Sequence, residues 1–393
     1  MRRAVLFASL LATSACTAMG ANPRGERLAK MQEGLRWNGD GFMDLLPRRD
    51  PSLGAILSRF LGDGGSQFAS PADEIPIVPR TRASFAEPTQ RGLRITWLGH
   101  STLLIEIDGK TILTDPVWGE RASPATWAGP QRFHPPPLPF EELPKIDAVV
   151  ISHDHYDHLD YPTILRFVET DVPFYVPLGV GAHLELWGIP PERIHEHDWW
   201  DVAELGKHRL VSVPSRHFSG RSLADRDQTL WTGWVITGPR RRVYFSGDTS
   251  FFPAMAEIGR RYGPFDATMI ESGAYNQLWS DVHVGPEQAV EAHRLVRGKV
   301  LIPVHWGTFD LALHGWTEPI ERVLAAAKKA KVVVLTPRPG QSFEPGIDEP
   351  PARWWPEVEW TSADQEPVRA TSRNRRIPAV RFATPPEDYP SWP

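Results

Sequence analysis

The chain reads Asp147-Ala148-Val149-Val150-Ile151-Ser152-His153-Asp154-His155-Tyr156-Asp157-His158 at positions 147–158, and this stretch decides its fold. The first half is a short apolar, β-branched run, which is typical of a buried strand. The second half places three histidines and two aspartates within six residues. In α/β proteins, ligands and catalytic groups collect on the loops that follow the carboxyl ends of strands. The stretch therefore predicts a buried strand with a polar site at its end.

A metal ion explains this density of polar side chains. Buried polar groups without partners cost roughly several kcal/mol each, so the cluster would make a poor core. Imidazole nitrogen and carboxylate oxygen are the ligands that zinc and similar cations take. In an extended loop, His153 and His155 fall on one side, while Asp157 and His158 can turn toward a second ion. The alternative is a solvated polar loop.

Three further polar residues follow apolar runs in the same way. His217, Asp248 and His305 each come one to three residues after such a run. Singly, each could be an ordinary hydrogen-bonded polar group. Four strand ends that present metal-binding side chains rarely arise by chance, so together they predict one shared site.

Short apolar runs bounded by turn residues continue along the chain and alternate with helix-like segments. The runs predict strands at 93–98, 102–107, 111–114, 148–152, 174–176, 210–214, 230–237, 242–246, 267–271, 300–304 and 332–335. The helix-like segments are 51–61, 162–169, 252–262, 286–296 and 318–330. Strands with interleaved helices favour a layered α/β protein.

The motif His-x-His-x-Asp-His at 153–158, together with His217, Gly247-Asp248-Thr249 and His305, resembles the metallo-β-lactamase superfamily. The resemblance implies an αββα sandwich with a two-metal site at the sheet edge. It also implies two Zn²⁺ ions, one bound by His153, His155, His217 and Asp248, the other by Asp157, His158, Asp248 and His305. Asp248 would bridge them, since a carboxylate can span ions about 3.5–4 Å apart. Water bound there would have its pKa lowered from about 15.7 toward about 7, giving a hydroxide that attacks phosphorus.

Longer stretches between Leu93 and Phe343 resemble N-acyl-phosphatidylethanolamine-hydrolysing phospholipase D. They are Trp97–Ser101, Leu113–Pro116, Arg121–Pro124, Gly129–Phe133, Ser152–Asp160, Asp198–Trp200, Gly273–Tyr275 and His305–Phe309. The resemblance implies a phosphoric diester hydrolase that converts N-acyl-phosphatidylethanolamine-like phospholipids to N-acylethanolamine and phosphatidic acid. The chain departs from the family pattern at Glu271-Ser272, which replaces apolar residues, and after His217. These departures concern the preference for acyl chain and headgroup rather than the metal chemistry.

Two residues are expected to act in catalysis, Asp157 and His283. His283 aligns with a family histidine placed near the substrate phosphate; the alternative is a loop residue ahead of a helix start. Asp115 is expected to hydrogen-bond to metal-binding histidines, and His100 matches a family motif without being an expected ligand. Other histidines are expected to be surface or structural: His134, His183, His195, His197, His208, His293 and His314.

The composition limits the domain organisation and the partners. With 393 residues and 41% hydrophobic residues, the chain fits one large domain with appendages or two domains. Its net charge of −5 gives no support to a nucleic-acid partner, which normally requires a basic surface. We predict a signal peptide over 1–20, an N-terminal extension packed on the main domain over 21–92, the hydrolase domain over 93–343 and a Pro-rich tail over 344–393. The 16 tryptophans could lie in the core or near lipid.

The first residues are typical of a secretory signal. Arg2 and Arg3 precede an apolar run over 4–12, followed by small residues and Cys16. Cys16 would be acylated in a bacterial lipoprotein, whereas ordinary secretion or an uncleaved tail are the alternatives. The expected location is the bacterial cell envelope, lipid-anchored or periplasmic, with a phospholipid substrate and a membrane surface as partners.

Two alternatives to the phospholipase function remain open. The same binuclear site could serve a lactonase or a hydrolase of soluble phosphoesters. The chain could also be a non-catalytic envelope lipoprotein, although the full ligand set argues against that. The sequence does not indicate the oligomeric state.

Overall fold

The structure is a computed structural model, and it describes residues 16–371 except for 35, 50–53, 55–64 and 349. The predicted signal segment lies outside the described residues up to position 15, and the predicted helix over 51–61 lies outside them except for Gly54.

Two seven-stranded sheets form the centre of the molecule. The first has the order β14 (Ser342–Phe343), β1 (Leu93–Gly99), β2 (Thr102–Ile107), β3 (Lys110–Thr114), β4 (Ala148–Val150), β5 (Phe174–Pro177) and β6 (Ile194–His197). The second has the order β13 (Val333–Val334), β12 (Val300–Val304), β11 (Ala267–Glu271), β10 (Arg242–Phe245), β9 (Gly233–Thr237), β8 (His208–Val213) and β7 (Val202–Leu205).

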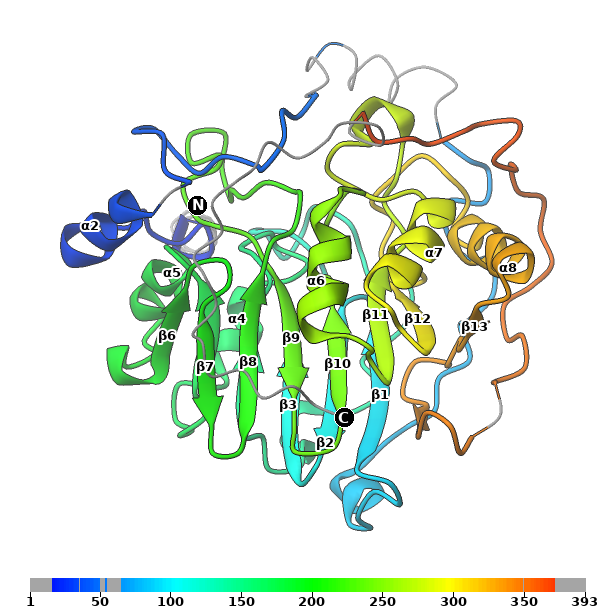
Figure 1. The fold of residues 1–393 in the computed structure, drawn as a ribbon, viewed down its shortest axis with the longest axis horizontal. Helices are drawn as coiled ribbons and strands as arrows, with labels where there is room; N and C mark the ends of the chain where they lie inside the picture. The colour runs from blue at the N-terminus through cyan, green and yellow to red at the C-terminus, as the bar shows by residue number, and fades with distance from the viewer. Residues whose placement is uncertain (1–15, 35, 50–53, 55–64, 349, 372–393) are drawn as a thin grey trace, which may run out of the picture.

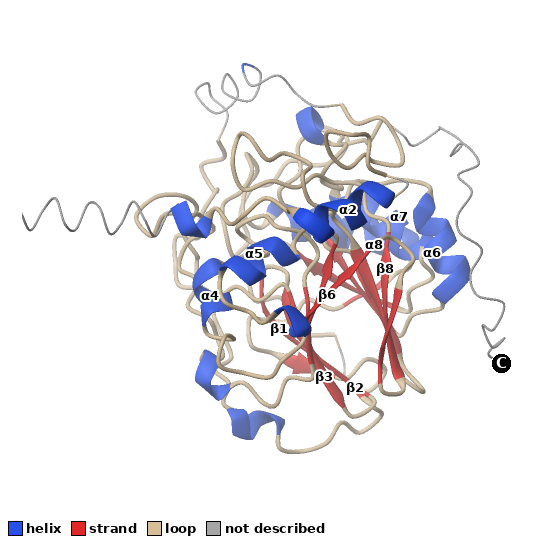
Figure 2. Cartoon of the chain, turned by 90° about the vertical axis from the view of Figure 1, so that its left-hand side faces the viewer, coloured by secondary structure: helices blue, strands red, loops and turns tan. Residues whose placement is uncertain are grey.

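Helices cover the outer faces of both sheets (Figures 1 and 2). Figure 2 shows the two sheets face to face, with α4 and α5 outside the first and α6 outside the second. The helices are α2 (Gly25–Glu33), α4 (Tyr161–Leu165), α5 (Gly181–Leu186), α6 (Ala254–Tyr262), α7 (Pro286–Leu295) and α8 (Glu318–Ala330). Short 3-10 turns are η1 (Arg82–Phe85), η2 (Phe140–Glu142), η3 (Pro191–Arg193) and η4 (Gln277–Trp279). The expected αββα sandwich is confirmed.

The strand directions bring several strand ends to one edge. In the second sheet β10, β11 and β12 run parallel, and β8 shares their direction because both it and β10 are antiparallel to β9. In the first sheet β3 and β4 are parallel, and β1 shares their direction because both β1 and β3 are antiparallel to β2. The loops after these seven strands carry the candidate site.

Helix α8 illustrates how the sequence forms its elements. Pro319 stands in its first turn, where the missing N–H costs nothing. Ile320, Val323 and Ala327 recur at helical spacing and are buried. Lys331 ends the helix in a left-handed conformation with φ 56°. The predicted bounds, 318–330, are those observed.

The core has two parts. The larger apolar cluster contains side chains of both sheets, such as Ile105 and Phe245, and of α6 to α8. The smaller one joins the first sheet to α4 and α5 through residues such as Val149, Ile164 and Leu184. Three tryptophans, Trp97, Trp231 and Trp234, are almost fully buried. These tryptophans are therefore core residues, whereas Trp127 is exposed.

The segments before β1 and after β14 pack onto the sandwich. Within the stretch 42–46, Phe42, Leu45 and Leu46 are buried and only Met43 is a large exposed apolar residue. After β14, Trp354 stacks on Trp306 with ring centroids 5.3 Å apart. The C-terminal segment thus lies directly behind the loop that follows β12.

Candidate metal centre

The seven predicted ligands come from four loops at one edge of the sandwich. His153, His155, Asp157 and His158 lie on the loop after β4, whereas His217 follows β8, Asp248 follows β10 and His305 follows β12. Their side chains form two adjacent groups whose ligand atoms lie within 4.8 Å of one another. The structure therefore brings together all seven residues that the sequence selected.

The first group consists of His153, His155, His217 and Asp248. Nδ1 of His155 lies 2.8 Å from Nε2 of His153 and 3.2 Å from Nε2 of His217. Oδ2 of Asp248 lies 3.8 Å and 3.7 Å from the same Nε2 atoms of His153 and His217. Three ring nitrogens and one carboxylate oxygen thus converge, as four-coordinate zinc requires.

The second group contains Asp157, His158 and His305, with His100 beside them. Oδ2 of Asp157 lies 3.3 Å from Nε2 of His158 and 3.2 Å from Nε2 of His305. It also lies 2.8 Å from Nε2 of His100. His100 is not an expected ligand, yet the structure places it within this group. It can act either as a further ligand or as the partner that orients Asp157.

Asp248 joins the two groups. Besides its contacts in the first group, its Oδ1 lies 3.2 Å from Nε2 of His158 and its Oδ2 lies 3.1 Å from Nε2 of His305. The preceding Gly247 has φ +55°, and a Cβ at that position would come within 2.5 Å of the Ser152 side chain. Glycine therefore permits the close approach that brings Asp248 between the β4 and β12 loops.

The donor set fits metal ions on physical grounds. Nε2 of His158 and Oδ1 of Asp248 are buried and make no hydrogen bond within the described chain. Such atoms are rare in native proteins unless they bind an ion or water. Nδ1 of His155 faces the Nε2 atoms of both His153 and His217, but a ring nitrogen carries at most one proton and cannot donate to both. A divalent cation in each group would use the lone pairs that converge there.

Burial and charge favour metal binding by these candidate ligands. Burial lowers the pKa of His153 and of His217 well below the usual value, which keeps both rings neutral and able to coordinate. Burial alone would lower the pKa of His305, but the Asp248 and Asp157 carboxylates outweigh this effect and raise the pKa to about 10. A bound cation would therefore displace a proton from that ring.

Asp115, which follows β3, orients His158. Its Oδ2 lies 2.7 Å from Nδ1 of His158, and its two oxygens accept hydrogen bonds from the N–H and the hydroxyl of Ser152. Because Nδ1 is hydrogen-bonded to Asp115, only Nε2 of His158 is available to coordinate an ion in the second group. The expected contact between Asp115 and a candidate metal-binding histidine is present.

Removing this orienting carboxylate is expected to weaken metal binding. We expect Asp115→Asn to lower Zn²⁺ affinity by about 10–100-fold, because outer partners of ligating histidines contribute on that scale. Competition with a chromophoric chelator measures the affinity. Asp147→Asn is the matched control, since Asp147 lies at the opposite end of β4 and pairs with Lys110. Equal zinc affinity in Asp115→Asn and the wild-type protein would contradict this role.

Three residues around the second group have backbone conformations that are uncommon for non-glycine residues. His100, Asp115 and His305 have φ values of 53°, 34° and 66°, each directly after a strand. Such conformations cost free energy and persist where surrounding contacts enforce them, often at functional sites. The rings of His100 and His305 lie 4.0 Å apart, centroid to centroid, and Asp115 contacts His158 of the same group.

His283, the second predicted catalytic residue, lies beside both groups. Its ring centroid is 4.9 Å from that of His217 and 5.4 Å from that of His305. Nδ1 lies 2.7 Å from Oε2 of Glu271, the last residue of β11. In the sequence, Glu271 stands out only as a departure from the family pattern. The signal that could have identified it was a carboxylate at the end of an otherwise apolar strand.

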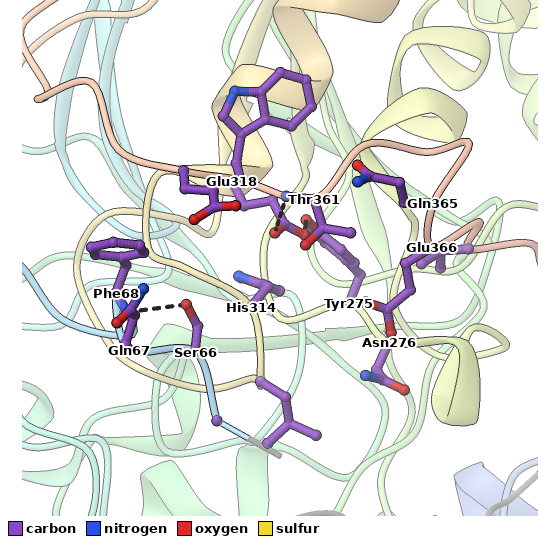
Figure 3. A pocket seen from close by; sticks show the side chains of 15 residues that line it. Ser66, Gln67, Phe68, Tyr275, Asn276, His314, Glu318, Thr361, Gln365 and Glu366 are labelled. Atoms are coloured by element: carbon purple, nitrogen blue, oxygen red, sulfur yellow. Dashed lines mark hydrogen bonds between the residues drawn. The ribbon is translucent and has the colours of Figure 1, made fainter. Parts of the chain in front are cut away.

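The other histidines lie outside both groups. Four of them, His134, His183, His208 and His293, are buried and make hydrogen bonds, as structural residues do. His314 lines a polar pocket of about 280 Å³ together with Tyr275 and Glu318 (Figure 3). None of the seven predicted ligands lines this pocket. His314 also lines a cavity of about 10 Å³ that reaches His305.

The family model described as "Beta-lactamase superfamily domain" matches residues 110–306, half of the chain. The chain belongs to the metallo-β-lactamase superfamily. It is a metal-dependent hydrolase of that superfamily, with the αββα fold predicted from the sequence.

Relatives of known sequence and structure agree with this assignment. An uncharacterised protein of Mycobacterium tuberculosis is 52% identical over 267 residues, which cover 67% of this chain and 72% of that protein. The N-acyl-phosphatidylethanolamine-hydrolyzing phospholipase D 1 of Caenorhabditis elegans is 40% identical over 235 residues, which cover 57% of this chain and 66% of that protein. The metallo hydrolase Igni18 of Ignicoccus hospitalis is 25% identical with a TM-score of 0.50, covering 64% of this chain and 98% of that structure.

Proposed function

We propose that this superfamily member is a zinc-dependent phosphodiesterase of phospholipase D type. Its substrate would be an N-acyl-phosphatidylethanolamine-like phospholipid, and its products an N-acylethanolamine and phosphatidic acid. The proposal is carried by one observation: two ligand groups bridged by Asp248 in a chain 40% identical over 235 residues to a phospholipase of that specificity.

Two zinc ions would be held by the seven ligands, one in each group, with Asp248 between them. Bound there, they would lower the pKa of water and neutralise the charge of a phosphodiester. Asp157 would orient the attacking water as well as serve as a ligand. His283 would donate a hydrogen bond to the phosphoryl oxygens or to the leaving oxygen. Its place between His217 and His305 supports that role.

An envelope location and a membrane partner belong to the same proposal. The side chain of Cys16 is exposed. The next residues are fixed near the β4 loop, because Arg221 donates hydrogen bonds to the carbonyls of both Ala18 and Asp154. An acyl group on Cys16 would therefore keep that loop close to lipid.

No helix among the described residues has the length and apolarity needed to cross a bilayer. The anchor is tested by labelling the wild-type protein and the Cys16→Ser variant with a fatty-acid probe. We expect label on the wild-type protein only, and a wild-type protein without label would rule the anchor out.

The test of function is turnover of a defined lipid. Zinc-loaded protein is incubated with N-acyl-phosphatidylethanolamine in mixed micelles, and mass spectrometry follows N-acylethanolamine and phosphatidic acid. Phosphatidylethanolamine without the N-acyl chain and a panel of lactones serve as comparisons. We expect both products from the N-acylated lipid. Turnover of a lactone without release of N-acylethanolamine would refute the phospholipase function while leaving the metal centre intact.

A further inference from the structure

Glu271 is a buried acid at the end of an apolar parallel strand. Its side chain is fully buried, and the other residues of β11 are Ala267, Thr268, Met269 and Ile270. A carboxylate in such a place is costly unless hydrogen bonds hold it. Because β10 and β12 flank β11 and carry Asp248 and His305 beyond their ends, Glu271 is placed beside the metal groups.

Each carboxylate oxygen of Glu271 has its own partners. Oε1 accepts a hydrogen bond from the backbone N–H of Thr249 at 2.5 Å and a longer one from the N–H of Val284 at 3.4 Å. Oε2 lies 2.7 Å from Nδ1 of His283. The backbone contacts fix the carboxylate, and the fixed carboxylate in turn holds the imidazole ring.

This contact limits what His283 can offer to a substrate. An imidazole has two ring nitrogens, and whichever of the two partners carries the shared proton, Nδ1 is engaged by Glu271. Only Nε2 remains. The His283 side chain is about one-seventh exposed (14%), so the ring is reachable from outside although Glu271 is not.

We infer that Glu271 is a positioning residue for His283: it holds Nδ1 and so presents Nε2 to the phosphodiester. The inference rests on the proposed function, in which His283 contacts the phosphoryl oxygens. It assigns to this chain a Glu–His pair at a position where the sequence departs from the family pattern of apolar residues. A ring free to rotate about its side-chain bonds would spend less time in the productive orientation.

Two other roles for Glu271 would lead to experimental results different from those expected of a residue that positions His283. Its carboxylate lies in one group with Asp248, His283 and His305, so it could itself help to bind metal. It could also be a scaffold that holds Thr249 and, through it, Asp248. Both of these roles would change metal content, and neither would depend on His283.

A double-mutant cycle separates these roles. Glu271→Met removes the carboxylate at similar volume, and we expect it to lower kcat/KM for bis(p-nitrophenyl) phosphate by about 10–100-fold with metal content unchanged. In a His283→Ala background the same change should cost less than about 2-fold. Glu271→Gln retains one hydrogen-bonding atom toward Nδ1 and should recover part of the loss. Glu318→Met is the matched control, a buried acid bonded to Tyr275 and Thr361.

An equal loss in both backgrounds, or release of metal from Glu271→Met, would overturn the inference. A readout independent of turnover keeps it distinct from the proposed function. In ¹⁵N-histidine-labelled protein, the ring signals of His283 are those that disappear in His283→Ala. We expect them to shift in Glu271→Met and not in Glu318→Met. Unchanged signals would overturn the Glu–His pair, whereas an inactive wild-type protein would refute only the proposed function.

Discussion

Replacing Asp248 with alanine is expected to lower phosphodiester turnover by more than about 100-fold and to release at least one metal ion. Residues that merely orient a ligating histidine contribute about 10–100-fold, and Asp248 stands between both groups. Its loss also removes one of the carboxylates that lie beside the rings of His158 and His305, whose contacts with Asp157 remain. Activity against bis(p-nitrophenyl) phosphate and metal analysis by mass spectrometry check the two parts.

The control for this variant is Asp266→Ala. Asp266 precedes β11, at the end of the strand opposite to the candidate site, and forms ion pairs with Arg241 and Lys299. Asp266 is buried, but both of its cationic partners are partly exposed, so losing each ion pair should cost about 0–1 kcal/mol of stability and no activity. An Asp248→Ala protein that keeps both ions and full activity would show that the site has been assigned to the wrong residues.

The second large effect is expected on stability, from Asp281→Ala. Oδ1 of Asp281 accepts a hydrogen bond from Nη1 of Arg216 at 3.0 Å, and both side chains are almost fully buried. Removing one member of a buried ion pair costs about 3–5 kcal/mol, because the remaining charge loses its compensation. Asp281 also accepts hydrogen bonds from the backbone N–H groups of Arg49 and Thr371. It therefore ties the N-terminal and C-terminal segments to the loop of His283.

The thermal unfolding midpoint measures this effect. Asp281→Ala should unfold at a clearly lower temperature than Asp266→Ala, whose ion pairs are more exposed. The domain boundaries predicted from the sequence give no information about the contacts of Asp281 with Arg216, Arg49 and Thr371. If the two variants unfold at the same temperature, the buried pair does not join the segments in the way described.

Much of the site could be predicted because its residues are local in sequence or follow strands. The stretch 153–158 supplies four of the seven candidate ligands at once. His217, Asp248 and His305 each follow an apolar run, and the parallel direction of β8, β10 and β12 brings those run ends together. Apolar runs of this kind are strong strand signals because burial on both faces of a sheet requires them.

Two of the strands that were not predicted have sequences with a weak strand signal, and one predicted strand is shortened by tertiary contacts. β6 (Ile194–His197) contains two histidines and a glutamate, and β7 (Val202–Leu205) alternates exposed and buried residues at a sheet edge. Edge strands need fewer apolar residues, so their signal is weak. The strand predicted over 230–237 begins only at Gly233, because the N–H groups of Leu230 and Thr232 bond to Leu178 and Ser152 instead. The helix predicted over 162–169 is shorter, Tyr161–Leu165.

The contacts of His100 and Glu271 could not be predicted for a different reason. The partner of each of these two side chains is set by which strands and loops lie next to it in the folded protein. Asp157, the partner of His100, lies 57 residues away, and the partner of Glu271 lies on a loop after η4. Sequence spacing carries no information on such pairings without the strand order.

Anomalous diffraction at the zinc absorption edge, measured on crystals of zinc-loaded protein, tests directly whether two metal ions bind at this site. We expect two peaks, one among His153, His155 and His217 and one among Asp157, His158 and His305, both next to Asp248. A single peak, or peaks bound by other residues, would contradict a binuclear centre at this edge of the sandwich.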